Sequence, residues 1–307
     1  MTDDNRVRAA TPDAIVAAAD ILRAGGIVAV PTETVYGLAA RAADGAAVAR
    51  IYAAKGRPSF NPLIVHVADA AQAATLAEVS PLAAALMAAF WPGPLTLVLP
   101  LRPGAPVASL VTAGLATIAL RCPAHPVMQA LIAAVGPLAA PSANASGRLS
   151  PTLARHVAAS LGAEVGLILD GGASAAGVES TIVAVEAEGW RLLRPGAVPV
   201  EALPPSPLWG GRVIAPGMLA SHYAPRQPVR LDAATAAADE FHIGFGAIAG
   251  DATLSPAGDL TEAAARLFDV LHQAEASGRA GIAVAPIPRH GLGLAINDRL
   301  ARAAAPR

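Results

Sequence analysis

The residues best suited to chemistry lie in the stretch IYAAKGRPSFNPLIVHV, residues 51–67. Lys55 is the only lysine among the 22 basic Lys and Arg residues, and Arg57 follows it on a turn that Gly56 and Pro58 constrain. A guanidinium binds phosphate oxygens in bidentate geometry, whereas an ammonium is a compact charge that can follow a moving group. The pair therefore indicates a polyphosphate site. The structural alternative is a solvated helix C-terminus, which basic residues stabilise weakly.

Two other segments concentrate hydroxyl and amide groups. PTETVYGL, residues 31–38, follows an apolar strand and could either line a small polar pocket or close a turn through local hydrogen bonds. APSANASGRLSPT, residues 140–152, is predicted to lead into a helix that Ser150 caps, with proline at the next position. Exposed amides at a helix N-terminus favour an anion, although a capped loop is the simpler interpretation. The polar side chains concerned are Thr32, Thr34, Tyr36, Ser142, Asn144, Ser146 and Ser150.

Two arginines are predicted at strand ends. Arg121 ends ATIALR and Arg194 ends WRLLRPG, so each guanidinium should lie at the rim of a sheet, where Arg121 could hold a carboxylate. His66 alternates with apolar residues in LIVHV, a position where histidine is more often structural than catalytic. His125 and His222 have no neighbours at metal-ligand spacing, so we expect no metal site built by the protein.

Composition excludes several classes of protein. A net charge of −1 and a pI near 6.7 provide no global field for a polyanion, so a dedicated nucleic-acid binder is not expected. The single cysteine, Cys122, excludes an internal disulfide and fits a reducing compartment. The N-terminus has acids where a secretory signal has basic residues, and prolines interrupt the apolar run at 79–101. We therefore expect a cytoplasmic protein without membrane association.

Helical and strand patterns alternate irregularly along the chain. This predicts an α/β fold with a mixed sheet over residues 8–200. Seven prolines between 199 and 228 indicate a linker over 201–228. The strand patterns FHIGF and GIAVAP, with helices over 260–276 and 294–304, predict a smaller α/β domain over 229–307. No P-loop or nucleophile-elbow motif occurs, and GFGAIAG has one residue too many before its last glycine for a dinucleotide fingerprint.

Taken in order, seven motifs resemble one family, the YrdC-like L-threonylcarbamoyladenylate synthases in the long form with an additional C-terminal domain. The resemblance extends from Thr11 to Pro225, with a looser likeness in GLGLAINDRLARAA near the end. It implies a YrdC-like mixed twisted sheet with flanking helices, followed by a smaller α/β/α, Rossmann-like domain. The motifs are PTETVYGL, KGRP with NPLIVHV, WPGPLTLVL, PSANASG, ESTIV, LRPG and APGMLASHYAP.

The resemblance also implies an activity and a set of site residues. The family condenses L-threonine, bicarbonate and ATP into L-threonylcarbamoyl-AMP and pyrophosphate, which feeds threonylcarbamoyl modification of the tRNA adenosine beside the anticodon. Mg²⁺ is expected through the ATP phosphates, and downstream tRNA threonylcarbamoyl-transfer proteins are expected as partners. Lys55 and Arg57 would be catalytic. The residues implied for ATP are Lys55, Arg57, Asn61, Thr117, Ser142, Asn144, Ser150, Arg194 and Tyr223. Those implied for threonine are Thr34, His66, Arg121 and Ser180.

Part of the linker, APGMLASHYAP, is long enough to lie over the pocket as a lid. Deleting Ser221 to Ala224 should leave the N-terminal domain folded but release or hydrolyse the intermediate. Two other functions are considered from the sequence. One is an RNA-binding module, against which the low charge and the sparse aromatic residues argue. The other is a YrdC-like enzyme that transfers a carbamoyl group to a different acceptor.

Overall fold

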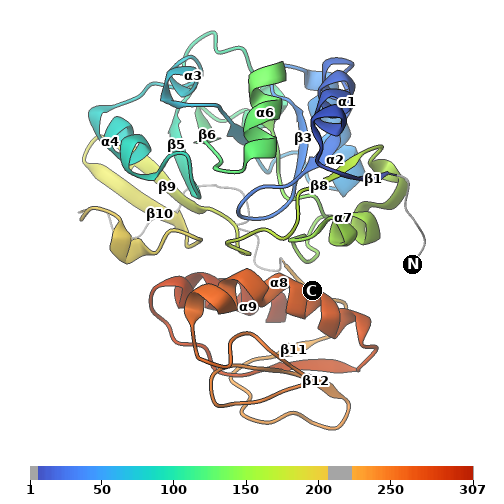
Figure 1. Ribbon diagram of the computed structural model, residues 1–307. Coiled ribbons are helices and arrows are strands. Elements are labelled where there is room, and N and C mark those ends of the chain that lie inside the picture. Colours follow the sequence, from blue (N-terminus) through green and yellow to red (C-terminus); the bar gives the residue numbers. More distant parts are fainter. Residues whose placement is uncertain (1–5, 207–222, 307) are drawn as a thin grey trace.

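The computed structural model describes residues 6–206 and 223–306, and ten strands of the N-terminal part form a single mixed sheet (Figure 1). Their order in space is β1 (Val7–Ala9), β8 (Ile168–Asp170), β2 (Val28–Val30), β3 (Gly37–Arg41), β7 (Leu138–Ala139), β4 (Ile64–His66), β6 (Thr117–Arg121), β5 (Leu95–Pro100), β9 (Thr181–Glu186) and β10 (Gly189–Arg194). Parallel and antiparallel neighbours alternate irregularly, so the predicted mixed sheet is confirmed.

The register of this sheet brings distant polar residues to one edge. β4 pairs with β6 in parallel and sets His66 opposite Arg121. Paired residues of neighbouring strands point to the same face, so these two side chains are neighbours. β9 begins immediately after Ser180, and Arg194 at the end of β10 pairs with Ile182 near that start. Residues from four strands thus meet at the same place.

Helices cover the sheet, as Figure 1 shows. They are α1 (Pro12–Arg23), α2 (Gly45–Lys55), α3 (Ala70–Ala74), α4 (Pro81–Phe90), α5 (Ser109–Thr112), α6 (Pro126–Val135) and α7 (Ala154–Leu161), with 3₁₀ turns at Gly162–Glu164 and Val200–Ala202. Thr11 caps α1 ahead of a proline, and Gly56 ends α2 in the left-handed conformation with φ 57°. That glycine turn ends the helix directly after Lys55.

One predicted cap is wrong. Ser150 was expected to cap a helix with Pro151 at its first position, but α7 begins at Ala154 and Leu153 occupies the capping position. The Ser150 hydroxyl donates to a carboxylate oxygen of Glu179 instead. A hydrogen bond to a buried charged group stabilises more than a bond to a helix amide, which explains the different use of this serine.

The C-terminal domain is a parallel four-stranded sheet with two helices. Its elements are β11 (Val229–Arg230), β12 (Glu240–Gly244), β13 (Ala252–Thr253), α8 (Leu260–Ala276), β14 (Gly281–Val284) and α9 (Leu292–Ala304). Both helices pack on each other on the face of the sheet that is turned toward the N-terminal domain (Figure 1). The domain therefore has two layers in its described residues, where three were expected.

The apolar core of the C-terminal domain extends to residues of the N-terminal domain. Val35, Leu149 and Val178 of the N-terminal domain belong to the cluster that contains Phe268 and Leu271 of α8. Burial of this shared surface supplies the main driving force for docking. None of the described helices is long and apolar enough to cross a bilayer.

Candidate functional site

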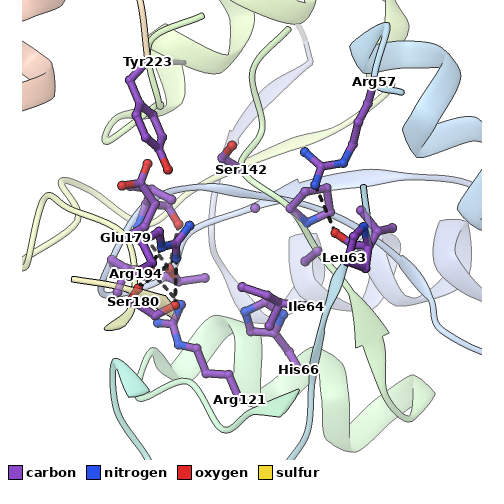
Figure 2. Close-up of a pocket in the computed structure, with 17 residues that line it drawn as sticks. Arg57, Leu63, Ile64, His66, Arg121, Ser142, Glu179, Ser180, Arg194 and Tyr223 are labelled. Carbon is purple, nitrogen blue, oxygen red and sulfur yellow. Dashed lines mark hydrogen bonds between the residues drawn. The ribbon is translucent and has the colours of Figure 1, made fainter. Parts of the chain in front are cut away.

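A cleft opens at the edge of the sheet, near the ends of β4, β6, β9 and β10, and eight of the predicted site residues line it. Figure 2 shows Arg57 on one side and Arg121, Arg194 and Ser180 on the other, with His66 and Ser142 between them. The lining residues predicted for ATP are Arg57, Ser142, Arg194 and Tyr223, and those predicted for threonine are Thr34, His66, Arg121 and Ser180.

Arg121 is held at three points. Its Nε donates to the Gly93 carbonyl at 3.2 Å and its Nη1 to the Thr34 hydroxyl at 2.8 Å, while Nη2 lies 2.7 Å from a Glu33 carboxylate oxygen. Burial alone would raise the pKa of Glu33, but the Arg121 charge holds that pKa below its usual value. The guanidinium is therefore fixed in direction before any ligand arrives, as a carboxylate-binding arginine should be.

His66 contributes a neutral polar wall beside Arg121. The side chain is buried, and burial together with the neighbouring positive charge of Arg121 lowers the pKa of His66 to about 3. An imidazole with that pKa is uncharged throughout the physiological range. It can exchange hydrogen bonds with a hydroxyl without adding a charge to the site.

Arg194 and Ser180 form the opposite corner. Arg194 Nη2 donates to the Ser180 carbonyl at 2.9 Å and to its hydroxyl oxygen at 3.2 Å. The Ser180 hydroxyl also shares a hydrogen bond of 2.7 Å with Thr96 on β5. Burial lowers the pKa of Arg194, yet a guanidinium remains protonated in such a site. The corner thus presents a fixed cation beside an ordered hydroxyl.

Arg57 is the cation on the other side of the cleft. Its Nη2 donates to the Pro62 carbonyl at 3.0 Å, and burial lowers its pKa to about 10. Within residues 6–206 and 223–306, neither Arg57 nor Arg194 makes an ion pair with a carboxylate. Two uncompensated cations in a low-dielectric cleft strongly favour an anionic ligand.

Lys55 does not line the cleft. Its buried ammonium donates to the backbone carbonyls of Ser142 and Asn144, so it ties the end of α2 to the segment that carries those two residues. Burial and then the Arg57 charge hold the pKa of Lys55 well below its ordinary value. Lysine with its point charge can serve two carbonyls in this small space. The role predicted for Lys55 at the ATP phosphates stays a prediction.

Four more predicted residues lie outside the lining of this cleft. Asn144 donates to the carbonyls of Ala145 and Arg148 and so shapes its own loop. Asn61 is buried, and its carbonyl accepts a hydrogen bond from Tyr52. Ser150 bonds to Glu179, as described above. Thr117 lines a separate, much smaller depression with mostly apolar walls, which shares Pro62 with the main cleft.

Tyr223 enters the cleft from the end of the linker. Its φ of 59° is rare for an aromatic residue. The amide of the next residue, Ala224, donates a hydrogen bond to the Gly147 carbonyl. Figure 2 shows the ring pointing toward Glu179 and Arg194. Ser221 and His222 of the expected lid lie outside the described residues, so the lid stays a prediction.

Sequence reasoning missed three charged residues. Glu33 lies within the quoted PTETVYGL motif and Glu179 begins ESTIV, but both were passed over in favour of their hydroxyl neighbours. Arg299 occupies the buried face of α9 between Ile296 and Leu300. A charge on an apolar helix stripe needs a partner, and that signal could have identified Arg299.

Comparison with known proteins accounts for this arrangement. The Sua5–YciO–YrdC family model, described as "Telomere recombination", matches residues 20–196, and the model described as "Threonylcarbamoyl-AMP synthase, C-terminal domain" matches residues 200–305. The threonylcarbamoyl-AMP synthase of Bacillus subtilis is 41% identical, with 95% of this chain and 93% of the relative covered. The chain belongs to the threonylcarbamoyl-AMP synthase family.

Further relatives match over most of the chain. The enzyme of the same name from Pyrococcus abyssi is 40% identical, with 93% of this chain and 92% of the relative covered. The crystal structure of Pyrococcus abyssi Sua5 complexed with L-threonine superposes with a TM-score of 0.85 at 38% identity and covers 94% of both chains. The expected YrdC-like fold and the resemblance itself are therefore confirmed.

Proposed function

We propose that this chain condenses L-threonine, bicarbonate and ATP into L-threonylcarbamoyl-AMP. The threonine amine and bicarbonate form a carbamate with loss of water. A carbamate oxygen then attacks the α-phosphorus, and the bond to the β-phosphate oxygen breaks to release pyrophosphate. The mixed anhydride would then be passed to tRNA threonylcarbamoyl-transfer proteins in the cytoplasm. The single observation that best supports this is the convergence of eight predicted residues on one cleft with uncompensated cations.

The main barrier to this reaction is electrostatic, because an anionic carbamate must approach a phosphate of an anionic nucleotide. Arg57 and Arg194 face each other across the cleft and are fixed by bonds to backbone carbonyls, so they need no reorganisation when charge moves. Losing one such preorganised donor typically costs about 3 kcal/mol of transition-state stabilisation. These two residues would carry the phosphates, with Ser142 and Tyr223 beside them.

Threonine would occupy the end of the cleft near β6. Arg121 would bind its carboxylate, and the neutral His66 with Thr34 and Ser180 would meet its polar groups. Holding the amine in one direction toward the nucleotide contributes separately from charge stabilisation.

The Mg²⁺ expected with ATP would be bound by the phosphate oxygens. Among the described residues no group of three or more His, Cys, Asp or Glu side chains could hold a metal. Glu33 and Glu179, two carboxylates beside the cleft, are already paired with arginines. Mg²⁺ would neutralise phosphate charge while ATP and water supply its ligands.

The test is a reaction containing ATP, bicarbonate and L-threonine, followed by mass spectrometry for L-threonylcarbamoyl-AMP and by a pyrophosphate assay. Reactions that lack threonine, or contain serine in its place, show whether the amino acid is the acceptor. Retention of labelled tRNA on filters across a range of salt concentrations examines direct RNA binding. Pyrophosphate release that does not depend on threonine would contradict the proposal.

A further inference from the structure

We propose that the C-terminal domain takes part in the reaction site through Arg299, a positioning residue that neutralises Glu179 in the wall of the cleft. The inference rests on the proposed function, because it assigns an effect on nucleotide binding. Arg299 lies on α9 of the C-terminal domain and is not among the residues that line the cleft.

Glu179 is the only carboxylate among the described residues that line the cleft. It lines the cleft and immediately precedes Ser180, whose carbonyl holds Arg194. One of its oxygens accepts the Ser150 hydroxyl, and the other accepts Arg299 Nε at 2.7 Å. Glu179 is thus fixed from one side by its own domain and from the other by α9.

Arg299 is completely buried although it comes from the other domain, with a side-chain exposure of 0%. Asp298 pairs with its Nη1 at 2.6 Å, and the guanidinium carbon lies 5.1 Å from the centre of the Tyr223 ring. Arg299 therefore contacts two residues of the cleft wall, Glu179 through an ion pair and Tyr223 through its ring face. No other described side chain of the C-terminal domain forms an ion pair with a residue of this cleft.

The electrostatic consequence follows from burial. Burial would raise the pKa of Glu179, but the Arg299 charge, followed by that of Arg194, holds this pKa below its usual value. Without Arg299, the carboxylate would either repel the triphosphate or take Arg194 as its partner. A buried charge that loses its partner is strongly unfavourable, and it recovers neutrality by binding a proton. Both effects act on the nucleotide before they act on threonine.

Other bonds between the domains provide a matched control. Arg155 pairs with Asp269 of α8 at 2.6 Å, but its side chain is 65% exposed, and neither residue lines the cleft. A variant that removes this pair tests simple adhesion between domains. If adhesion were all that Arg299 contributed, R155M and R299M would differ only in stability.

The experiment measures the affinity of the full-length chain for a non-hydrolysable ATP analogue, and KM for ATP and for threonine. The variants are R299M, R299K, E179Q, the double variant R299M/E179Q, and R155M. We expect R299M to weaken ATP binding at least tenfold and to raise the threonine KM much less. R299K, which keeps the charge, should lie between R299M and the parent. R155M should keep the parent's ATP affinity.

Two readouts separate positioning from a structural role. In R299M/E179Q no unpaired carboxylate remains, so ATP affinity should recover to within about threefold of E179Q. In R299M, affinity should improve as pH falls, because Glu179 then binds a proton. A double variant as weak as R299M, a flat pH profile, or parental affinity in R299M overturns the inference. If R299M does not fold, the double variant decides alone. Failure of the parent to form L-threonylcarbamoyl-AMP would refute the proposed function instead.

Discussion

Replacing Lys55 by arginine keeps a positive charge but changes its shape and its reach. The ammonium now serves the carbonyls of Ser142 and Asn144 from a position that is only 3% exposed. A guanidinium is larger and its donors are fixed in one plane, so we expect it not to reproduce both bonds of the compact ammonium in this buried space. A hydrogen bond to a charged donor is worth about 1.5–3 kcal/mol, so loss of one of the two bonds should displace the Ser142 segment at that cost.

That displacement should appear in catalysis. We expect K55R to lower kcat/KM for ATP at least tenfold, which corresponds to about 1.4 kcal/mol. Steady-state pyrophosphate release measures the effect, and circular dichroism confirms folding. The matched control is R50K on the same helix, because Arg50 is exposed and, within the part of the chain that the structure describes, donates only to the Gly25 carbonyl.

The pH profile adds an independent check on this reasoning. Because burial lowers the pKa of Lys55, this residue loses its proton at a lower pH than an ordinary lysine. ATP binding should therefore weaken on the basic side in the parent, whereas K55R should lack that limb since arginine stays charged. A folded K55R variant with kcat/KM within threefold of the parent would refute the role assigned to Lys55.

Three other predictions follow from single contacts. R121K should raise the threonine KM about 10- to 100-fold and the ATP KM less, because a bidentate carboxylate contact is worth about 1.5–3 kcal/mol. Steady-state kinetics measures both constants, and an equal rise in the ATP KM would contradict this assignment. His66 is neutral in the fold with a pKa of about 3 but binds a proton near 6.5 when unfolded, so folding stability should fall as pH drops. Between about pH 7.5 and about pH 5, His66 should contribute about 2 kcal/mol to the loss of unfolding free energy measured with urea, so H66N should lose about 2 kcal/mol less than the parent. G177A would place a methyl group 2.4 Å from the Ala264 carbonyl oxygen and should cost about 1–3 kcal/mol in thermal unfolding, whereas G278A, with a similar positive φ and no atom within 4 Å, is the control that should cost less.

Local rules predicted the elements well where sequence and packing agree. Thr11, Ser80 and Gly56 mark helix ends as expected, and the α8 helix begins and ends at the predicted residues. Ser150 fails because a charged partner far away in sequence competes for its hydroxyl. Local pattern cannot reveal a partner that only the tertiary fold supplies.

The same limit explains the prediction of site residues. Arg121 and His66 could be placed together once both were assigned to strand ends, since parallel pairing sets one opposite the other. Lys55 stands out in the sequence by its rarity, but its bonds to the Ser142 and Asn144 carbonyls depend on the path of that segment in the tertiary fold. Motif spacing indicates which residues gather at a site and does not distinguish those that touch a ligand from those that hold the wall.

The pairing of Glu33 and Glu179 explains how a cleft proposed to bind anionic substrates can have two carboxylates beside it. Glu33 orients Arg121, and Arg121 neutralises the charge of Glu33. Both residues come from the N-terminal domain. Glu179 holds Ser150 but has its neutralising arginine on α9. Because each carboxylate is compensated before the substrates arrive, Arg57 and Arg194 keep their full charge for the nucleotide. The electrostatic balance of the cleft therefore depends on the C-terminal domain being docked.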